Sequence, residues 1–343
     1  MYESFFGLTG KPFQLNPDPS FYFGSRGHKR AFAYLEYGLY QSEGFIVITG
    51  EIGAGKTTIV RSLLEQLDPA KVVAAQIVST QLDADDMLRA VGVAFGLPVA
   101  SIDKAMLLAS LEAHFCQLAV DDKRALLVVD EAQNLTPRAI EELRMLSNFQ
   151  LGDRALLQSF LIGQPELREM MQGPGMQQLR QRIIASYHLG PLDRAETRAY
   201  IEHRLHHVGW KDDPHFEMAS FELIHALTGG IPRRINTLCN RLLLAAFLGE
   251  RHVLSEGDVQ AVAGEIRDEL GPDAALSPVV RVAAPAAESA PLGRVDAGTL
   301  QAHFNHLEER IDRLEKTVGA SVDLLYRLLH PEKASKPGTP GRG

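Results

Sequence analysis

The chain has 343 residues, of which 45% are hydrophobic, and a formal net charge of −8. Its length predicts about two domains with appendages, and its hydrophobic content is enough for an ordinary packed core. The acidic balance excludes a globally basic surface for nucleic acid, so only a local basic patch could serve such binding.

Neither a targeting segment nor a membrane span is expected. The first residues lack the basic start and the apolar stretch of a signal peptide, and no window of about 18 apolar residues occurs. The two cysteines, Cys116 and Cys239, lack the spacing of a metal site, which favours buried thiols in a reducing compartment. We therefore expect a cytoplasmic protein.

Residues 1–40 form the first expected unit, an arm rich in phenylalanine, proline and glycine that leads into a helix over 28–40. The aromatic side chains of the arm need burial, so we expect it to be folded. Two roles stay open for the arm: it packs against the rest of the protein, or it wraps the base of a bound nucleotide.

Residues 41–190 alternate between short apolar runs and helical patterns. This alternation predicts an α/β core with a parallel five-stranded sheet and helices on both faces. The expected strands cover 45–48, 72–78, 125–129, 156–162 and 183–189. The expected helices cover 57–67, 83–95, 104–120, 135–149 and 165–171.

The turn after the first expected strand carries the strongest motif. It fits the phosphate-binding pattern G-x-x-x-x-G-K-[ST] and lies between a strand and a helix, as this motif requires. Glycines let the backbone point its N–H groups at an anion, and the helix N-terminus adds positive charge. Lys56 is expected to reach the β- and γ-phosphates of ATP, and the Thr57 hydroxyl to ligate Mg²⁺. The expected nucleotide-binding residues are Gly50, Glu51, Ile52, Gly53, Ala54, Gly55, Lys56, Thr57 and Thr58.

The third expected strand ends in two carboxylates, Asp130 and Glu131, which is the Walker B pattern of ATPases. The pattern follows the phosphate-binding loop by about 75 residues, so we expect Asp130 to hold Mg²⁺ through water. We expect Glu131 to orient and activate the attacking water as a general base.

Polar residues next to the last two strands are further candidates. Gln164 follows the fourth expected strand at the carboxyl edge of the sheet, where it could contact the γ-phosphate or the attacking water. Arg182, with Arg180 as second choice, precedes the fifth strand and could serve a neighbouring subunit as an arginine finger. The alternatives are a plain loop amide for Gln164 and a surface salt bridge for the arginine.

Residues 191–270 have a purely helical pattern and are expected to form a helical lid domain. The expected helices cover 194–208, 217–228, 232–248 and 255–270. Arg233 stands at the start of the third of these helices, from where it could sense the nucleotide across the domain cleft. An exposed cation is the alternative for this residue.

The C-terminal part divides into three segments. Residues 271–298 are rich in alanine and proline and are expected to be a linker. Residues 299–330 have apolar positions at alternating spacings of four and three, which predicts a coiled coil or, alternatively, an amphipathic helix that docks on its own ATPase domain. Residues 331–343 have the composition of a disordered tail.

Together these motifs resemble an AAA+ ATPase, and over about residues 1–268 the chain is similar to the general secretion pathway protein A (ExeA-like) family. The resemblance is carried by the opening with its FGL at 6–8 and PDP at 17–19, and by DEAQNL at 130–135, GQPEL at 163–167 and GIPRRIN at 230–236. It implies ATP and Mg²⁺ binding, a ring or other oligomer, and work beside a membrane export or envelope-assembly machine. The family's members usually continue into a transmembrane segment and a peptidoglycan-binding region. With a linker and coiled coil instead, the chain looks more like the shorter relatives associated with exosortase (PEP-CTERM) and exopolysaccharide gene clusters.

The main hypothesis is therefore a Mg²⁺-dependent ATPase that acts as an oligomeric motor or switch on a protein partner at the inner face of the membrane. One alternative is a DNA-associated ATPase of the transposition-helper type, with Arg233, Arg234 and Arg241 as a basic surface. The acidic net charge disfavours nucleic acid as the partner. A nucleotide-gated scaffold with little hydrolysis is the remaining alternative.

Overall fold

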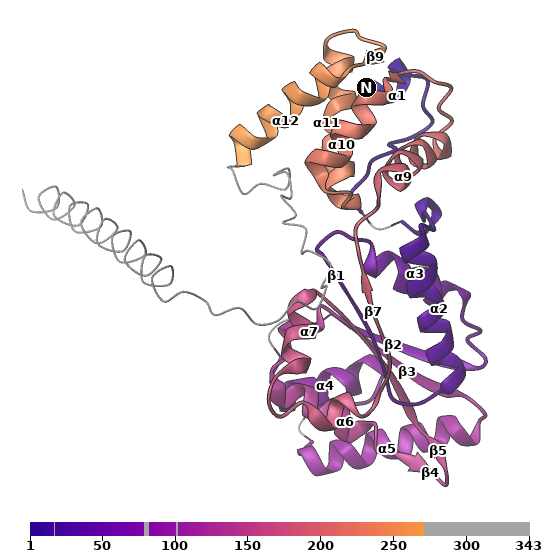
Figure 1. Cartoon of the computed structure of the whole chain (residues 1–343). Coiled ribbons are helices and arrows are strands. Elements are labelled where there is room, and N and C mark those ends of the chain that lie inside the picture. The colour runs from indigo at the N-terminus through magenta and orange to yellow at the C-terminus, as the bar shows by residue number, and fades with distance from the viewer. Residues whose placement is uncertain (17, 79–81, 101, 271–343) are drawn as a thin grey trace, which may run out of the picture. The chain divides into compact units, whose positions relative to one another are not determined.

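The computed structural model describes residues 1–16, 18–78, 82–100 and 102–270 (Figure 1). The predicted linker (271–298), coiled coil (299–330) and tail (331–343) lie outside these residues. In the described part of the chain, no helix is both long and apolar enough to cross a bilayer.

A parallel five-stranded sheet forms the centre of the core, in the order β2-β3-β6-β1-β7. Its strands are β1 (Phe45–Gly50), β2 (Val72–Val78), β3 (Arg124–Asp130), β6 (Leu157–Gly163) and β7 (Ile183–Leu189). Because all strands run in one direction, their carboxyl ends meet at one edge, where ligands bind in open α/β sheets. The predicted sheet is confirmed.

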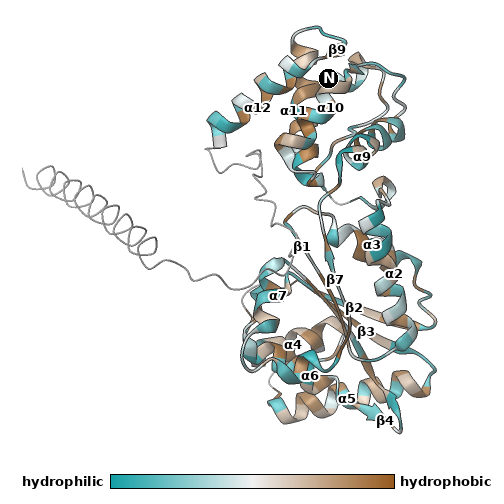
Figure 2. Cartoon of the chain, in the orientation of Figure 1, coloured by the Kyte–Doolittle hydropathy of each residue, from teal (hydrophilic) through white to brown (hydrophobic). Residues whose placement is uncertain are grey.

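Successive residues of each strand point to opposite faces of the sheet, and both faces are covered. On one face Ile46 and Ile48 of β1 pack with α2 (Arg26–Gln41) and α3 (Lys56–Gln66). On the other face Phe45 and Val47 pack in the cluster of the remaining core helices. These helices are α4 (Ala84–Ala94), α5 (Lys104–Val120), α6 (Pro137–Leu146) and α7 (Pro165–Gln172). Figure 2 shows the result as apolar strands between helices whose outer sides are polar.

The helix predicted over 135–149 is too long at both ends. Thr136 caps α6 by accepting a hydrogen bond from the Ala139 N–H, so the helix begins at Pro137. Its other end is Leu146, because the next residues turn into a small hairpin with Gly152 in the left-handed region. The hairpin strands are β4 (Gln150–Leu151) and β5 (Arg154–Ala155). Short helical turns η2 (Ala132–Asn134) and α8 (Gln177–Arg180) complete the core.

The predicted helical lid is confirmed. Its helices are α9 (Arg194–His207), α10 (Met218–Thr228), α11 (Pro232–Leu248) and α12 (Glu256–Leu270). A short parallel pair, β8 (His215–Phe216) and β9 (Val253–Leu254), joins two loops of this domain.

The N-terminal arm packs into the lid. Phe6 and Phe13 are buried in the lid's hydrophobic cluster, and the Tyr2 hydroxyl donates to Asn240 Oδ1 at 2.9 Å. The buried Arg204 of α9 donates from Nε to the Pro12 carbonyl at 2.5 Å. The arm contains two short helical turns, α1 (Tyr2–Phe5) and η1 (Pro19–Phe21). The packing role predicted for the arm is therefore present in its first half.

Candidate nucleotide-binding site

The loop between β1 and α3 has the shape of a phosphate cradle, and its glycines are required by what surrounds it. Gly53 and Gly55 have φ values of +80° and +99°, in the left-handed region that favours glycine. A Cβ on Gly53 would lie 2.3 Å from Cβ of Arg233, and one on Gly55 would lie 2.6 Å from Nε2 of His28. Neighbours on two sides thus fix the loop in a conformation that suits a bound phosphate.

Lys56 is the first residue of α3, and its side chain folds back into the loop. The Nζ donates to the carbonyls of Gly50 at 2.7 Å and Glu51 at 2.9 Å. Burial lowers the pKa of the Lys56 ammonium, and the carboxylates of Glu131 and Asp130 offset part of this effect. The ammonium is therefore held beside the acidic strand end, within reach of an anion in the cradle.

The next residue, Thr57, meets the end of β3. Its hydroxyl donates to Oδ2 of the buried Asp130 at 2.9 Å. A hydroxyl and a carboxylate are hard oxygen ligands of the kind that Mg²⁺ prefers, and this ion keeps several ligands from water and phosphate. No group of three or more His, Cys, Asp or Glu residues in the described chain could hold a metal. The pair thus fits Mg²⁺ bound partly by a nucleotide and does not fit an ion enclosed by protein.

Glu131 lies just beyond Asp130 and is brought together with Gln164. Oε2 of Glu131 accepts hydrogen bonds from Gln133 Nε2 at 2.6 Å and Gln164 Nε2 at 3.1 Å. Burial acts to raise the pKa of Glu131, but the two amide donors and the charge of Lys56 outweigh it and the pKa lies below its ordinary value. The carboxylate is therefore ionised and oriented at neutral pH, as a general base must be.

A cavity of about 370 Å³ is lined by Lys56, Thr57 and Glu131, together with residues of the arm and the lid. Arg233 of α11 faces it, and its backbone N–H donates to the Gly53 carbonyl at 3.1 Å. Tyr22 and Phe23 of the arm also line this cavity. The second half of the arm thus lines the cavity, and its proposed role at the nucleotide base stays a prediction.

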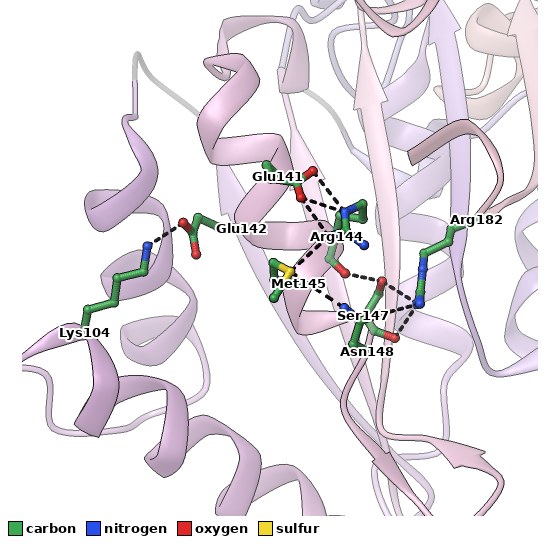
Figure 3. Close-up of polar contacts among 8 residues, drawn as sticks. All are labelled: Lys104, Glu141, Glu142, Arg144, Met145, Ser147, Asn148 and Arg182. Carbon is green, nitrogen blue, oxygen red and sulfur yellow. Dashed lines mark hydrogen bonds and ion pairs between the residues drawn. The ribbon is translucent and has the colours of Figure 1, made fainter. Parts of the chain in front are cut away.

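Arg182 is not part of this cavity. It precedes β7, and Ile183 is paired with Phe45 at the start of β1, so Arg182 lies at the edge of the sheet opposite Gly50. Figure 3 shows its contacts with Ser147 and Asn148. Its Nη1 donates to the Ser147 carbonyl at 2.9 Å, and its Nη2 contacts Asn148 Oδ1. This guanidinium caps the C-terminus of α6, where a cation is favoured by the helix dipole. Arg180 is likewise bound to a carbonyl, that of Met171, at 2.7 Å.

Several residues of the site were not predicted from sequence, among them Gln133, His28 and Arg204. Gln133 bridges Glu131 and Gln164 and stands inside the quoted DEAQNL segment, which was the one available signal. His28 is buried against Gly55, and Nδ1 of its ring lies 2.7 Å from Ser25 Oγ. Arg204 lines the cavity beside the arm. For His28 and Arg204 no local pattern marks the role, because it comes from contacts with Gly55 and with the Pro12 carbonyl, which lie in other segments.

A parallel sheet in this order, with the loop after β1, two carboxylates after β3 and a helical lid, defines a P-loop ATPase fold of the AAA type. Residues 39–171 match the family described as an AAA domain. Solved structures agree with this fold. Cdc6p of Pyrobaculum aerophilum has a TM-score of 0.58 and 17% identity, over 77% of this chain and 70% of that one. The ORC2 protein of Aeropyrum pernix has a TM-score of 0.53 and 20% identity, over 70% of this chain and 66% of that one.

The sequence is also similar to a particular protein, General secretion pathway protein A of Aeromonas hydrophila. The two are 42% identical over 273 residues, which are 78% of this chain and 50% of that protein. The chain thus spans about half the length of this curated relative. The AAA domain and this identity together support the predicted ExeA-like AAA family.

Proposed function

We propose that the protein hydrolyses ATP, with Mg²⁺, as an oligomeric motor or switch. The observation that carries this proposal is the meeting of Lys56, the Thr57–Asp130 pair and the oriented Glu131 under one cavity. A protein that only bound nucleotide would not need the ionised Glu131 at this place.

The roles of the residues follow from their positions. Lys56 supplies positive charge at the phosphates, and Thr57 and Asp130 would hold Mg²⁺, which neutralises charge on the phosphate oxygens when it is bound. Glu131 accepts a proton from the attacking water as the water adds to the γ-phosphorus and the bond to the bridging oxygen breaks. The products are ADP and inorganic phosphate. Gln164 orients Glu131, and Arg233 lies where it could report the state of the loop to the lid.

The first test is ATP hydrolysis measured at increasing protein concentration. Glu131→Gln should keep nucleotide binding and lose about 100-fold or more in turnover, because it removes the general base. Full turnover in Lys56→Ala would show that the site is wrongly assigned. A specific activity that rises with concentration supports a site shared between subunits. Turnover no higher than that of Glu131→Gln would instead favour a nucleotide-gated scaffold.

The proposed finger, Arg182, needs a test that separates it from its capping role. A mixture of Lys56→Ala and Arg182→Ala proteins should regain turnover that neither has alone, since some sites would combine an intact loop with an intact arginine. Asn148→Ala is the matched control, because it removes an acceptor of the same guanidinium and keeps the arginine. If the mixture stays inactive and Arg182→Ala only melts earlier, Arg182 is a helix cap alone. The same mixture can then be made with Arg180→Ala.

We further propose that the chain supports export or assembly at the cell envelope from the inner face of the membrane. The identity to General secretion pathway protein A supports this role. The finer proposal, a link to exosortase sorting of proteins or to exopolysaccharide export, rests on the resemblance described above. Deletion of the gene and complementation with wild type or Lys56→Ala would test it. Unchanged surface polysaccharide and unchanged protein sorting would refute it.

The DNA-associated alternative receives less support from the arginines that suggested it. Arg233 faces the nucleotide cavity, and Arg241 forms an ion pair with Glu269 at 2.6 Å. Mobility-shift measurements over a salt series would decide, since binding through phosphates weakens steeply with salt. A shift at low salt that disappears as salt rises would return DNA to consideration.

A further inference from the structure

We propose that Gln133 is the positioning residue that holds the Glu131 carboxylate away from Lys56 and fixes it to the end of β6. This inference rests on the proposed ATPase function, in which Lys56 serves the phosphates and Glu131 serves the water. It assigns a role to a side chain that acts through Glu131.

Both ends of one amide are used. Gln133 Nε2 donates to Glu131 Oε2 at 2.6 Å, and Gln133 Oε1 accepts from the Gln164 backbone N–H at 3.0 Å. The orientation of this amide is settled by chemistry, because a backbone N–H can only donate and a carboxylate can only accept. Gln133 therefore links the carboxylate to the backbone at the start of α7.

The surroundings make room for this amide and fix its base. A Cβ on Gly163 would lie 2.9 Å from Gln133 Oε1, so glycine at the end of β6 leaves the space that the amide occupies. Gln133 itself stands on the turn η2, anchored by the buried side chains of Ala132 and Leu135. The amide is thus presented from a rigid turn to a rigid strand end.

Lys56 and Glu131 carry opposite charges beside the same cavity and attract each other. In the described chain no ion pair joins Lys56 to a carboxylate, and its ammonium donates to two loop carbonyls instead. Glu131 has its backbone in the left-handed region, at φ 54°, and its Oε2 is occupied by the two glutamine amides. A direct Lys56–Glu131 ion pair would impair both roles. Lys56 would no longer be available to the phosphates, and Glu131 would no longer be available to the attacking water.

The test measures nucleotide affinity as well as turnover. Gln133→Met keeps the length of the side chain and removes both hydrogen bonds, and Gln133→Glu keeps an acceptor and removes the donor. Either change should lower kcat about 10- to 100-fold, because the base loses its orientation. Either should also weaken ADP binding, measured by calorimetry, about threefold or more, because Lys56 becomes paired. Gln178→Met, at an exposed position of α8, is the matched control.

A double variant gives the decisive comparison. In a Glu131→Gln background there is no carboxylate at position 131 to pair with Lys56, so Gln133→Met should no longer weaken ADP binding. An equal loss of affinity in both backgrounds, or a kcat within twofold of wild type, would overturn the proposal. Because ADP binding needs no hydrolysis, failure of the proposed ATPase activity would leave this comparison intact.

Discussion

His28 should make the stability of the protein depend on pH between about pH 7.5 and pH 5. His28 is 6% exposed, and its ring lies against the phosphate-binding loop. Burial lowers the pKa of His28 from an ordinary 6.5 to about 4, although a backbone contact with Ala54 and the charge of Glu196 oppose this shift. At a pH between these two pKa values, His28 therefore binds a proton in the unfolded chain and does not bind one in the folded protein. Stability from this group is complete above the unfolded pKa and is lost as the pH falls toward the folded pKa.

The size of this effect follows from the shift. One pKa unit corresponds to about 1.4 kcal/mol, so about 2 kcal/mol of unfolding free energy should be lost between about pH 7.5 and pH 5. Carboxylates contribute to acid unfolding as well, so the effect of His28 must be isolated with a variant. His28→Gln keeps a neutral side chain that can hydrogen-bond and has no charge to gain.

The assay is chemical denaturation followed by circular dichroism at several pH values for both proteins. The variant is expected to be less stable than wild type at neutral pH, because the ring packs against the loop. The difference in unfolding free energy between the two proteins should shrink by about 2 kcal/mol as the pH falls to about 5, since only the wild type takes up the extra proton on unfolding. Parallel curves for the two proteins over this range would refute the reasoning.

Other substitutions test the packing around the site. Gly53→Ala should weaken nucleotide binding about tenfold or more, because its Cβ would lie 2.3 Å from Cβ of Arg233. Gly152→Ala is the control, since Gly152 has a similar φ and nothing lies within 4 Å of its Cβ. Equal nucleotide affinity in both variants would contradict this expectation. Arg204→Met should cost about 2 kcal/mol of stability and expose the arm to proteolysis, because two arm carbonyls lose their donor. An arm that stays resistant to proteolysis in Arg204→Met would contradict this expectation. Asp193→Ala removes the capping box of α9 and should cost about 1 kcal/mol in thermal or chemical unfolding, and an unchanged melting curve would count against it.

Much of the fold could be predicted because its signals are local. The apolar runs over 72–78 and 183–189 became strands with the same bounds, and the helices over 104–120 and 232–248 begin and end as expected. α6 lies within the helix predicted over 135–149. Its end was missed because two-residue strands such as β4 carry too few side chains to show a period.

The residues of the candidate site likewise differ in whether a local sequence signal marks them. The loop and the two carboxylates could be found because the residues that act together there are neighbours in sequence. His28 and Gln133 could not, because each acquires its role from a partner in another segment, Gly55 and Gln164 respectively. For Arg182, position along the chain indicated a finger. Only the folded chain shows that this guanidinium caps α6, 35 residues away.

The packing of the N-terminal arm into the lid bears on how the chain reaches its native state. The Tyr2 hydroxyl contacts Asn240, 238 residues further on, and Phe6 and Phe13 belong to a cluster that includes side chains of α9, α10, α11 and α12. On the ribosome the aromatic residues of the arm must therefore wait for nearly the last of the described residues before they can be buried. Closing so long a loop is slow, and exposed aromatic side chains invite aggregation meanwhile. A fragment that starts at residue 39, where the AAA match begins, would leave the lid with a permanent hole in its core.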